Sequence, residues 1–167
     1  LKADFAIVIG RTTLSRSINS YIALATKTYV VDPRISTIDT KRTDSQVFFA
    51  LPKLEVTSLN PSWISDWYEI SKLAGVAISQ DQGWSEQSAL TAIAAGVPEG
   101  SALFVGASRP IRDIEAFAAP RNGINVFANR GLAGIDGNIS SVIGIALNRR
   151  KTFAVIGDLA FLHDING

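Results

Sequence analysis

The strongest constraint on the fold is a regular alternation of short apolar runs with helix-like stretches in the second half of the sequence. Apolar runs stand at 102–105, 125–128 and 152–156, and stretches with helical spacing follow at 111–119, at 139–147 and from 159 onward. Runs this short are typical of strands buried on both faces, and strict strand–helix alternation predicts a parallel sheet covered by helices. We therefore expect an α/β fold with parallel sheets flanked by helices.

The first half repeats this pattern less regularly. An apolar run at 5–9 ends at Gly10, helical spacing follows over about 14–25, and a second apolar run at 28–31 ends at Asp32-Pro33. These residues predict a βαβ unit with a right-handed crossover, and 46–51 is a third candidate strand. The pattern restarts after 75–83, with a helix beginning near Ser85. We therefore expect two partial Rossmann-like three-layer domains, 1–75 and 84–167, joined by a linker at 76–83.

Composition narrows the classes of partner. The 16 lysines and arginines balance 15 acidic residues, which argues against nucleic acid as the main partner. No apolar run reaches the roughly 20 residues of a membrane helix, and the sequence does not open like a signal peptide, so we expect a cytoplasmic protein without an integral membrane segment. There is no cysteine, and the only histidine, His163, is expected on a helix surface. Because the chain also lacks methionine, we expect it to be a fragment of a longer polypeptide.

Candidate binding residues stand at the carboxyl ends of the expected strands, where open α/β sheets bind ligands. Ser108 and Arg112 are one helical turn apart, so that a hydroxyl and a guanidinium could share one carboxylate. The alternative is a pairing within the helix, of Arg109 or Arg112 with Asp113 or Glu115.

Three further strand ends carry charged residues. Arg16 lies in a polar turn that flanks a helix start, where it could bind an anion or belong to a solvated helix cap. Arg130 precedes a glycine-rich loop that allows a ligand to approach the backbone. Gly157-Asp158 follows the last apolar run and offers a hard carboxylate suited to magnesium, although many such aspartates only cap a helix.

Three segments together resemble the thiamine-diphosphate-dependent enzymes. They are LFVGASRPIRD at 103–113, NRGLAGIDG at 129–137 and GDLAFLHDING at 157–167. Within that family they are most similar to the carboligases of menaquinone biosynthesis, in which Gly-Asp-Leu replaces the more general Gly-Asp-Gly. The resemblance covers the whole chain but only part of a full-length member: part of the central domain at 1–75, and the first half of the diphosphate-binding domain at 84–167. Ala107 and Ala160 depart from the family, which has Asn and Ser there.

The resemblance implies a transferase that decarboxylates 2-oxoglutarate on thiamine diphosphate and adds the succinyl unit to isochorismate, with Mg²⁺ or Mn²⁺ as the metal. It assigns binding of the substrate carboxylates to Ser108, Arg112, Arg130 and Arg16. It assigns Asp158 to the metal, and contact with the cofactor to Gly134, Ile135, Gly157, Asp158 and Leu159.

The resemblance also indicates what this chain lacks. In the family an activating Glu lies on the amino-terminal domain, and a second metal ligand, an Asn, lies beyond the residue equivalent to Asp158. No catalytic residue is therefore expected within these 167 residues, and the chain alone is expected to be inactive. The family's active sites form between subunits, which implies a homodimer or homotetramer for the full-length enzyme.

Two alternatives stay open at this point. One is another thiamine-diphosphate carboligase or decarboxylase of the acetohydroxyacid synthase type, which would take pyruvate. The other is a non-catalytic nucleotide-binding α/β module built on the strand that ends at Gly10, although the turn lacks the second and third glycines of a dinucleotide fingerprint.

Overall fold

The computed structural model describes residues 2–10, 15–34, 46–53, 55, 60–80, 83–129, 134–149 and 151–167. They form two compact units, Leu1–Lys72 and Leu73–Gly167, each described by itself below. The boundary between the units lies inside helix α2 (Pro61–Gln80). The assignment of these regions to the domains of an enzyme stays a prediction. None of the described helices combines the length and the apolar character needed to cross a membrane.

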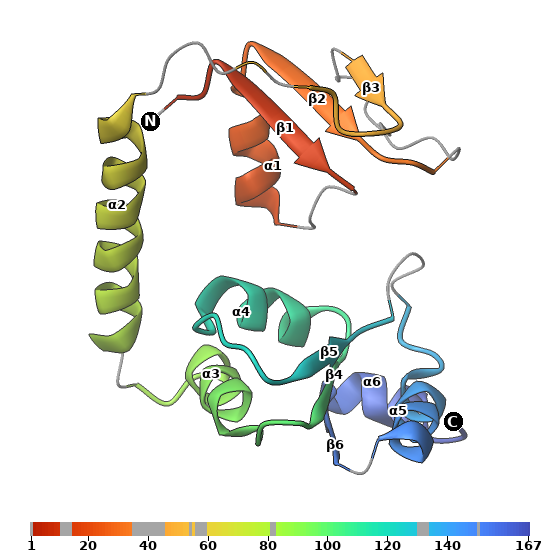
Figure 1. Cartoon of the computed structure of the whole chain (residues 1–167). Coiled ribbons are helices and arrows are strands. Elements are labelled where there is room, and N and C mark those ends of the chain that lie inside the picture. The colour runs from red at the N-terminus through yellow and green to blue at the C-terminus, as the bar shows by residue number, and fades with distance from the viewer. Residues whose placement is uncertain are drawn as a thin grey trace. The chain divides into compact units, whose positions relative to one another are not determined.

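The first unit contains the expected βαβ arrangement. Strands β1 (Phe5–Ile9), β2 (Lys27–Val31) and β3 (Gln46–Phe48) form a parallel sheet in that order, and α1 (Arg16–Ile22) connects the first two (Figure 1). The N–H of Asp32 donates the last ladder bond, to the carbonyl of Phe48 at 2.9 Å. Pro33 follows and has no N–H to donate, so the ladder ends there. The predicted strand at 46–51 is therefore shorter than expected.

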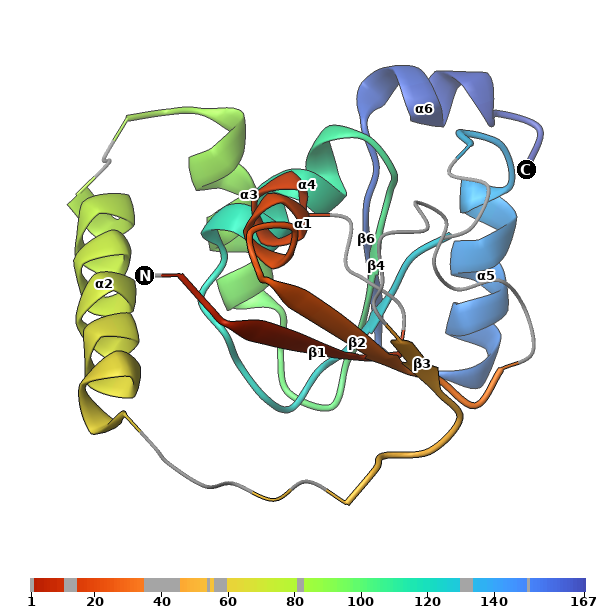
Figure 2. The same cartoon turned by 90° about the horizontal axis from the view of Figure 1, so that it is seen from above.

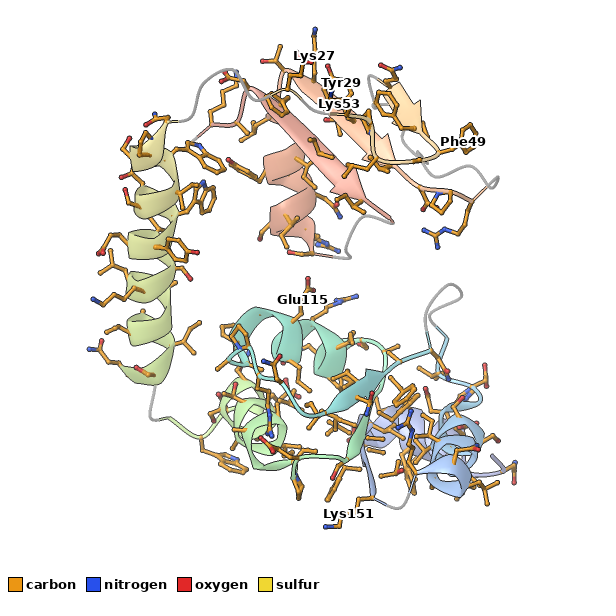
Figure 3. The ribbon with its side chains drawn as sticks, in the orientation of Figure 1. Lys27, Tyr29, Phe49, Lys53, Glu115 and Lys151 are labelled. Atoms are coloured by element: carbon orange, nitrogen blue, oxygen red, sulfur yellow. The ribbon has the colours of Figure 1, made fainter. Side chains whose placement is uncertain are left out.

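Aromatic side chains pack against one another within this unit. Tyr29, which Figure 3 labels on β2, lies between Phe5 and Phe48, with ring centroids 6.4 and 6.1 Å away. Tyr21 of α1 meets Trp67 of α2 edge to face at 5.2 Å. None of the described residues of α2 is fully buried. Edge-to-face packing of this kind is favourable beyond the area it buries.

The second unit is built around a second parallel sheet in the order β5-β4-β6 (Figure 1). The strand at the centre is the first of the three in the sequence. The alternation of strands and helices predicted for this half is confirmed. Its elements are α3 (Glu86–Gly96), β4 (Ala102–Val105), α4 (Arg109–Phe117), β5 (Asn125–Phe127), α5 (Asn138–Asn148), β6 (Thr152–Val155) and α6 (Asp158–His163).

Strand β4 supplies the core of the second unit. All four of its residues are 0–1% exposed. Leu103 and Val105 pack with Val97 on one side, against partly buried isoleucines of α4. Burying an aliphatic or aromatic side chain of this size contributes about 1.5–3 kcal/mol. Helix α3 begins with a capping box, in which the Ser85 and Ser88 hydroxyls accept from each other's backbone N–H at 3.1 and 2.9 Å.

Gly106 is required where β4 leaves the sheet. Its N–H donates to the carbonyl of Val155 at 2.8 Å, and a Cβ at this position would lie 3.2 Å from that carbonyl oxygen and 3.3 Å from the Cα of Ile156. Both obstacles are backbone atoms, which cannot move aside as a flexible side chain can. The glycine therefore allows the ends of β4 and β6 to approach closely.

We expect Gly106→Ala to lower the free energy of unfolding by about 1–3 kcal/mol, because the added methyl overpacks the strand end. Gly144→Ala is the matched control: it lies inside α5, nothing stands within 4 Å of its added Cβ, and it should leave stability equal or raise it by about 0.5–1 kcal/mol. Urea denaturation followed by circular dichroism measures both variants. Equal stability of the two would contradict the close approach described here.

Candidate functional site

The carboxyl ends of three parallel strands meet at one edge of the second sheet. Val105 of β4 is in register with Val155 of β6, and Phe104 is in register with Phe127 of β5. Parallel strands in register end at the same edge, so the residues that follow them are brought together there. Ser108 follows β4 and Asp158 follows β6 at this edge.

Ser108 has an unusual backbone conformation. It is the only described non-glycine residue with a positive φ, at 71°, and it immediately precedes α4. Its side chain is exposed and makes no capping bond to the helix. A non-glycine residue in this region stores roughly 1–3 kcal/mol of strain, and such residues occur preferentially at functional sites. The backbone strain at Ser108 was not expected from the sequence.

The two arginines of α4 have different environments. The guanidinium of Arg109 lies 3.2 Å from the Asp113 carboxylate, and this is the pairing within the helix that the sequence left open. It also lies 3.3 Å from the carboxylate of Glu86, which belongs to α3. Arg112 is exposed and makes no ion pair or hydrogen bond within the described part of the chain. Glu115, labelled in Figure 3, is also exposed and pairs with neither arginine. Arg112 is thus the cation of this helix that can bind an external carboxylate.

Asp158 is the first residue of α6, with Gly157 as its N-cap. Its carboxylate is exposed and has no hydrogen bond or ion pair to a described residue, while the neighbouring Leu159 is 75% exposed. Among the described residues no three His, Cys, Asp or Glu side chains come together to hold a metal. Asp158 is therefore not part of a ligand cluster within the described chain, and a divalent cation bound to it would need its other ligands from elsewhere.

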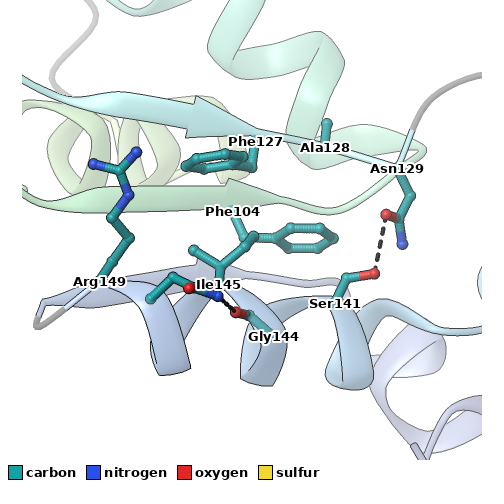
Figure 4. A pocket seen from close by; sticks show the side chains of 9 residues that line it. Phe104, Phe127, Ala128, Asn129, Ser141, Gly144, Ile145 and Arg149 are labelled. Atoms are coloured by element: carbon teal, nitrogen blue, oxygen red, sulfur yellow. Dashed lines mark hydrogen bonds between the residues drawn. The ribbon is translucent and has the colours of Figure 1, made fainter.

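Gly134 and Ile135 lie in the turn that leads into α5. Gly134 is exposed and Ile135 is half-buried. Asn138, which is 1% exposed, donates from Nδ2 to the Ile135 carbonyl at 2.8 Å and so closes the turn. Asn129, at the end of β5, donates to the Gly137 carbonyl at 3.4 Å and accepts from the Ser141 hydroxyl at 3.1 Å, as Figure 4 shows. This network joins the end of β5 to the start of α5.

Asp164 completes the network from α6. It is 8% exposed, and its carboxylate accepts the N–H of Ile139 at 2.7 Å and the N–H of Gly137 at 2.9 Å. These two backbone amides hold the pKa of Asp164 below its usual range. A helix leaves its first N–H groups without internal partners, and Gly137, the N-cap of α5 with a φ of 75°, has no side chain to accept them. The sequence interpretation missed Asp164, Asn138, Asn129 and Ser141.

The other two predicted arginines are not among the described residues of the second unit. Arg130 lies outside the described residues, so its role stays a prediction. Arg16 is the exposed first residue of α1 and belongs to the first unit, which is described separately.

An open groove of about 440 Å³ runs between the sheet and α5. Phe104, Phe127 and Ile145 form its apolar wall, and Arg149 and the bonded pair of Asn129 and Ser141 line it as well (Figure 4). None of the described residues predicted to bind substrate or cofactor lines this groove. The predicted site is therefore the edge of the sheet and not this groove.

The chain has relatives among characterised proteins, although no family model matches it. Over 98% of its length it is 35% identical to the 2-succinyl-5-enolpyruvyl-6-hydroxy-3-cyclohexene-1-carboxylate synthase of Thermobifida fusca. Over its whole length it is 31% identical to the synthase of the same name from Oceanobacillus iheyensis, and over 66% of its length it is 40% identical to that of Lysinibacillus sphaericus. The chain spans 31% of the length of the first two of these relatives and 20% of the third.

We expect the stability contributed by Asp164 to depend on pH. Because its pKa is lowered in the folded state, the contribution is present above the unfolded pKa of about 3.9 and is lost as the pH falls through the folded value. Asp164→Asn removes the titrating group. The stability difference between wild type and this variant should be constant near neutral pH and shrink below a pH of about 4. Urea denaturation over a pH series measures it, and a difference that does not change with pH would contradict the assignment.

Proposed function

Because this chain is homologous along its whole length to a segment of the 2-succinyl-5-enolpyruvyl-6-hydroxy-3-cyclohexene-1-carboxylate synthases, we propose that it is part of such an enzyme. The complete enzyme would decarboxylate 2-oxoglutarate and join the succinyl unit to isochorismate in menaquinone biosynthesis. Both substrates carry carboxylates. The segment would contribute part of the substrate site and part of the cofactor site.

The observation that carries this proposal is the contrast between the two arginines of α4. Arg109 is neutralised by Glu86 and Asp113, whereas Arg112 is exposed and unpaired among the described residues, one turn after the strained Ser108. A guanidinium and a free hydroxyl at a strand end form a suitable donor set for a carboxylate. The backbone strain at Ser108 points the same way, because strained residues occur preferentially at functional sites and bring no advantage to a helix end that is only solvated. By resemblance, Arg130 and Arg16 would bind substrate carboxylates as well.

The described residues also fit part of a site for thiamine diphosphate and Mg²⁺ or Mn²⁺. Asp158 has a free carboxylate to hold the metal, beside Gly157 and Leu159. Gly134 and Ile135 stand in a turn held by the Asn138 network, and the apolar Ile135 would support the cofactor there. Thiamine diphosphate, when bound, supplies the carbanion chemistry that decarboxylation of a 2-oxoacid requires. The residues of this chain bind and orient, and the activating acid would come from another domain.

The homologues favour this function over the two alternatives considered from the sequence. The relatives described above share the synthase name, which gives an acetohydroxyacid synthase type no support. A nucleotide-binding module would depend on the turn after Gly10, and residues 11–14 of that turn lie outside the described part of the chain. We propose that the complete enzyme works in the cytoplasm as a homodimer or homotetramer.

In the complete enzyme, Arg112→Ala should raise the KM for one of the two carboxylate substrates by roughly 10–100-fold, the usual loss for one hydrogen bond to a charged group. Its dissociation constant for thiamine diphosphate should stay unchanged. Arg109→Ala is the matched control from the same helix, because its charge is already paired with Glu86 and Asp113, and its KM values should stay near wild type. Steady-state kinetics and cofactor titration measure both variants. A similar rise of KM in both would show that Arg112 has no particular role.

The 167-residue protein alone should show no turnover of 2-oxoglutarate with isochorismate when thiamine diphosphate and Mg²⁺ are supplied. The physical reason is that the described residues hold no cluster of metal-ligating side chains, and the activating Glu is expected on another domain. Consumption of 2-oxoglutarate and release of carbon dioxide are the measurements. Activity from the purified segment would disprove this prediction.

A further inference from the structure

Helix α6 carries one carboxylate at each end, and the two differ in their surroundings. Asp158, its first residue, is exposed and unpaired among the described residues. Asp164, the residue after its last turn, is buried and accepts the two backbone N–H groups at the start of α5. Helix α6 lies at one end of α5, and the residue after its last turn bonds to the start of α5 (Figure 2).

The start of α5 depends on this distant carboxylate. In most helices a Ser, Thr, Asp or Asn at the N-cap accepts these N–H groups from within the same segment. Here the N-cap is Gly137, and the acceptor stands 25 to 27 positions away in the sequence. Asn138 closes the preceding turn through the Ile135 carbonyl at 2.8 Å. The turn that carries Ile135 is thus held by Asn138 from within and by Asp164 from α6.

We propose that Asp164 is a positioning residue that fixes the turn at 134–138 against α6, so that Ile135 and Asp158 are presented together to one ligand. The ligand's identity as metal-bound thiamine diphosphate rests on the function proposed above. The link between the two segments is short, because the six residues of α6 span only about 9 Å. A local cap at position 137 would satisfy the same N–H groups but would not tie the turn to the helix that begins with Asp158.

The test compares Asp164→Ala and Asp164→Asn with Asp136→Ala in the complete enzyme. Asp136 is the comparison: it is an acidic residue of the same turn, and its carboxylate also reaches α6, through His163 Nδ1 at 3.1 Å, but its side chain is 80% exposed, so this contact should contribute far less than that of the buried Asp164. Two properties are measured on each variant. Hydrogen exchange of peptides covering 134–141 reports on the turn without reference to activity, and titration gives the dissociation constant for thiamine diphosphate with Mg²⁺.

We expect Asp164→Ala to speed exchange at Gly137 and Ile139 by at least roughly tenfold and to weaken cofactor binding by roughly tenfold, as for one lost charge-assisted hydrogen bond. Asp164→Asn, which keeps one acceptor oxygen, should be intermediate, and it provides the comparison if the alanine variant does not fold. Asp136→Ala, which loses only an exposed contact to α6, should change each property by no more than roughly twofold.

Three results would overturn the inference. Unchanged exchange in the Asp164 variants would show that the carboxylate does not hold the turn. Faster exchange with unchanged cofactor affinity would show that Asp164 is only a helix cap. Failure of the wild-type enzyme to bind thiamine diphosphate would overturn the proposed function, and with it the claim that Ile135 and Asp158 share that ligand. The hydrogen-exchange measurement would still show whether Asp164 holds the turn.

Discussion

The hydrogen-bonded ladders on both sides of β4 are the constraint on which the second unit depends. Its four residues are almost completely buried, and they align β5 on one side and β6 on the other. Because the strands are parallel and in register, the chain must leave all three at the same edge. The polar residues that follow each strand are therefore concentrated in one region, although they are tens of positions apart in the sequence. Gly106 adds to this by letting two strand ends approach within backbone contact.

The order of strands and helices could be predicted from the sequence because it depends on local apolar periodicity. The end of β3 at Phe48 could not, because it is decided by the neighbouring strand, where Pro33 stops the ladder. The positions of Ser108 and Arg112 at a helix start also followed from local spacing. Which arginine would be paired did not, because Glu86, on a different helix, helps to hold Arg109.

The residues that hold the candidate site were the hardest to predict. Asp164 reads as an ordinary polar residue near the end of a short helix, and nothing in its own neighbourhood indicates that it accepts the amides of Gly137 and Ile139. Long-range polar contacts of this kind have no sequence period. They exist because a buried helix start must satisfy its N–H groups from whichever acceptor the fold brings near. Sequence motifs suggested the residues predicted to contact a ligand. The residues that hold those segments in place could be found only from the three-dimensional structure.

The outer strands of the second sheet influence how the protein behaves at high concentration. Strands β5 and β6 each pair with β4 on one side only, and Val126 and Phe153 on them are 55% and 42% exposed. An unpaired strand edge is a template for pairing with another molecule, and a formal net charge of +1 supplies little repulsion to prevent it. Among the described residues, the outer edges of β5 and β6 are therefore where contact between two such molecules is physically favoured, and added charge at those edges would oppose it.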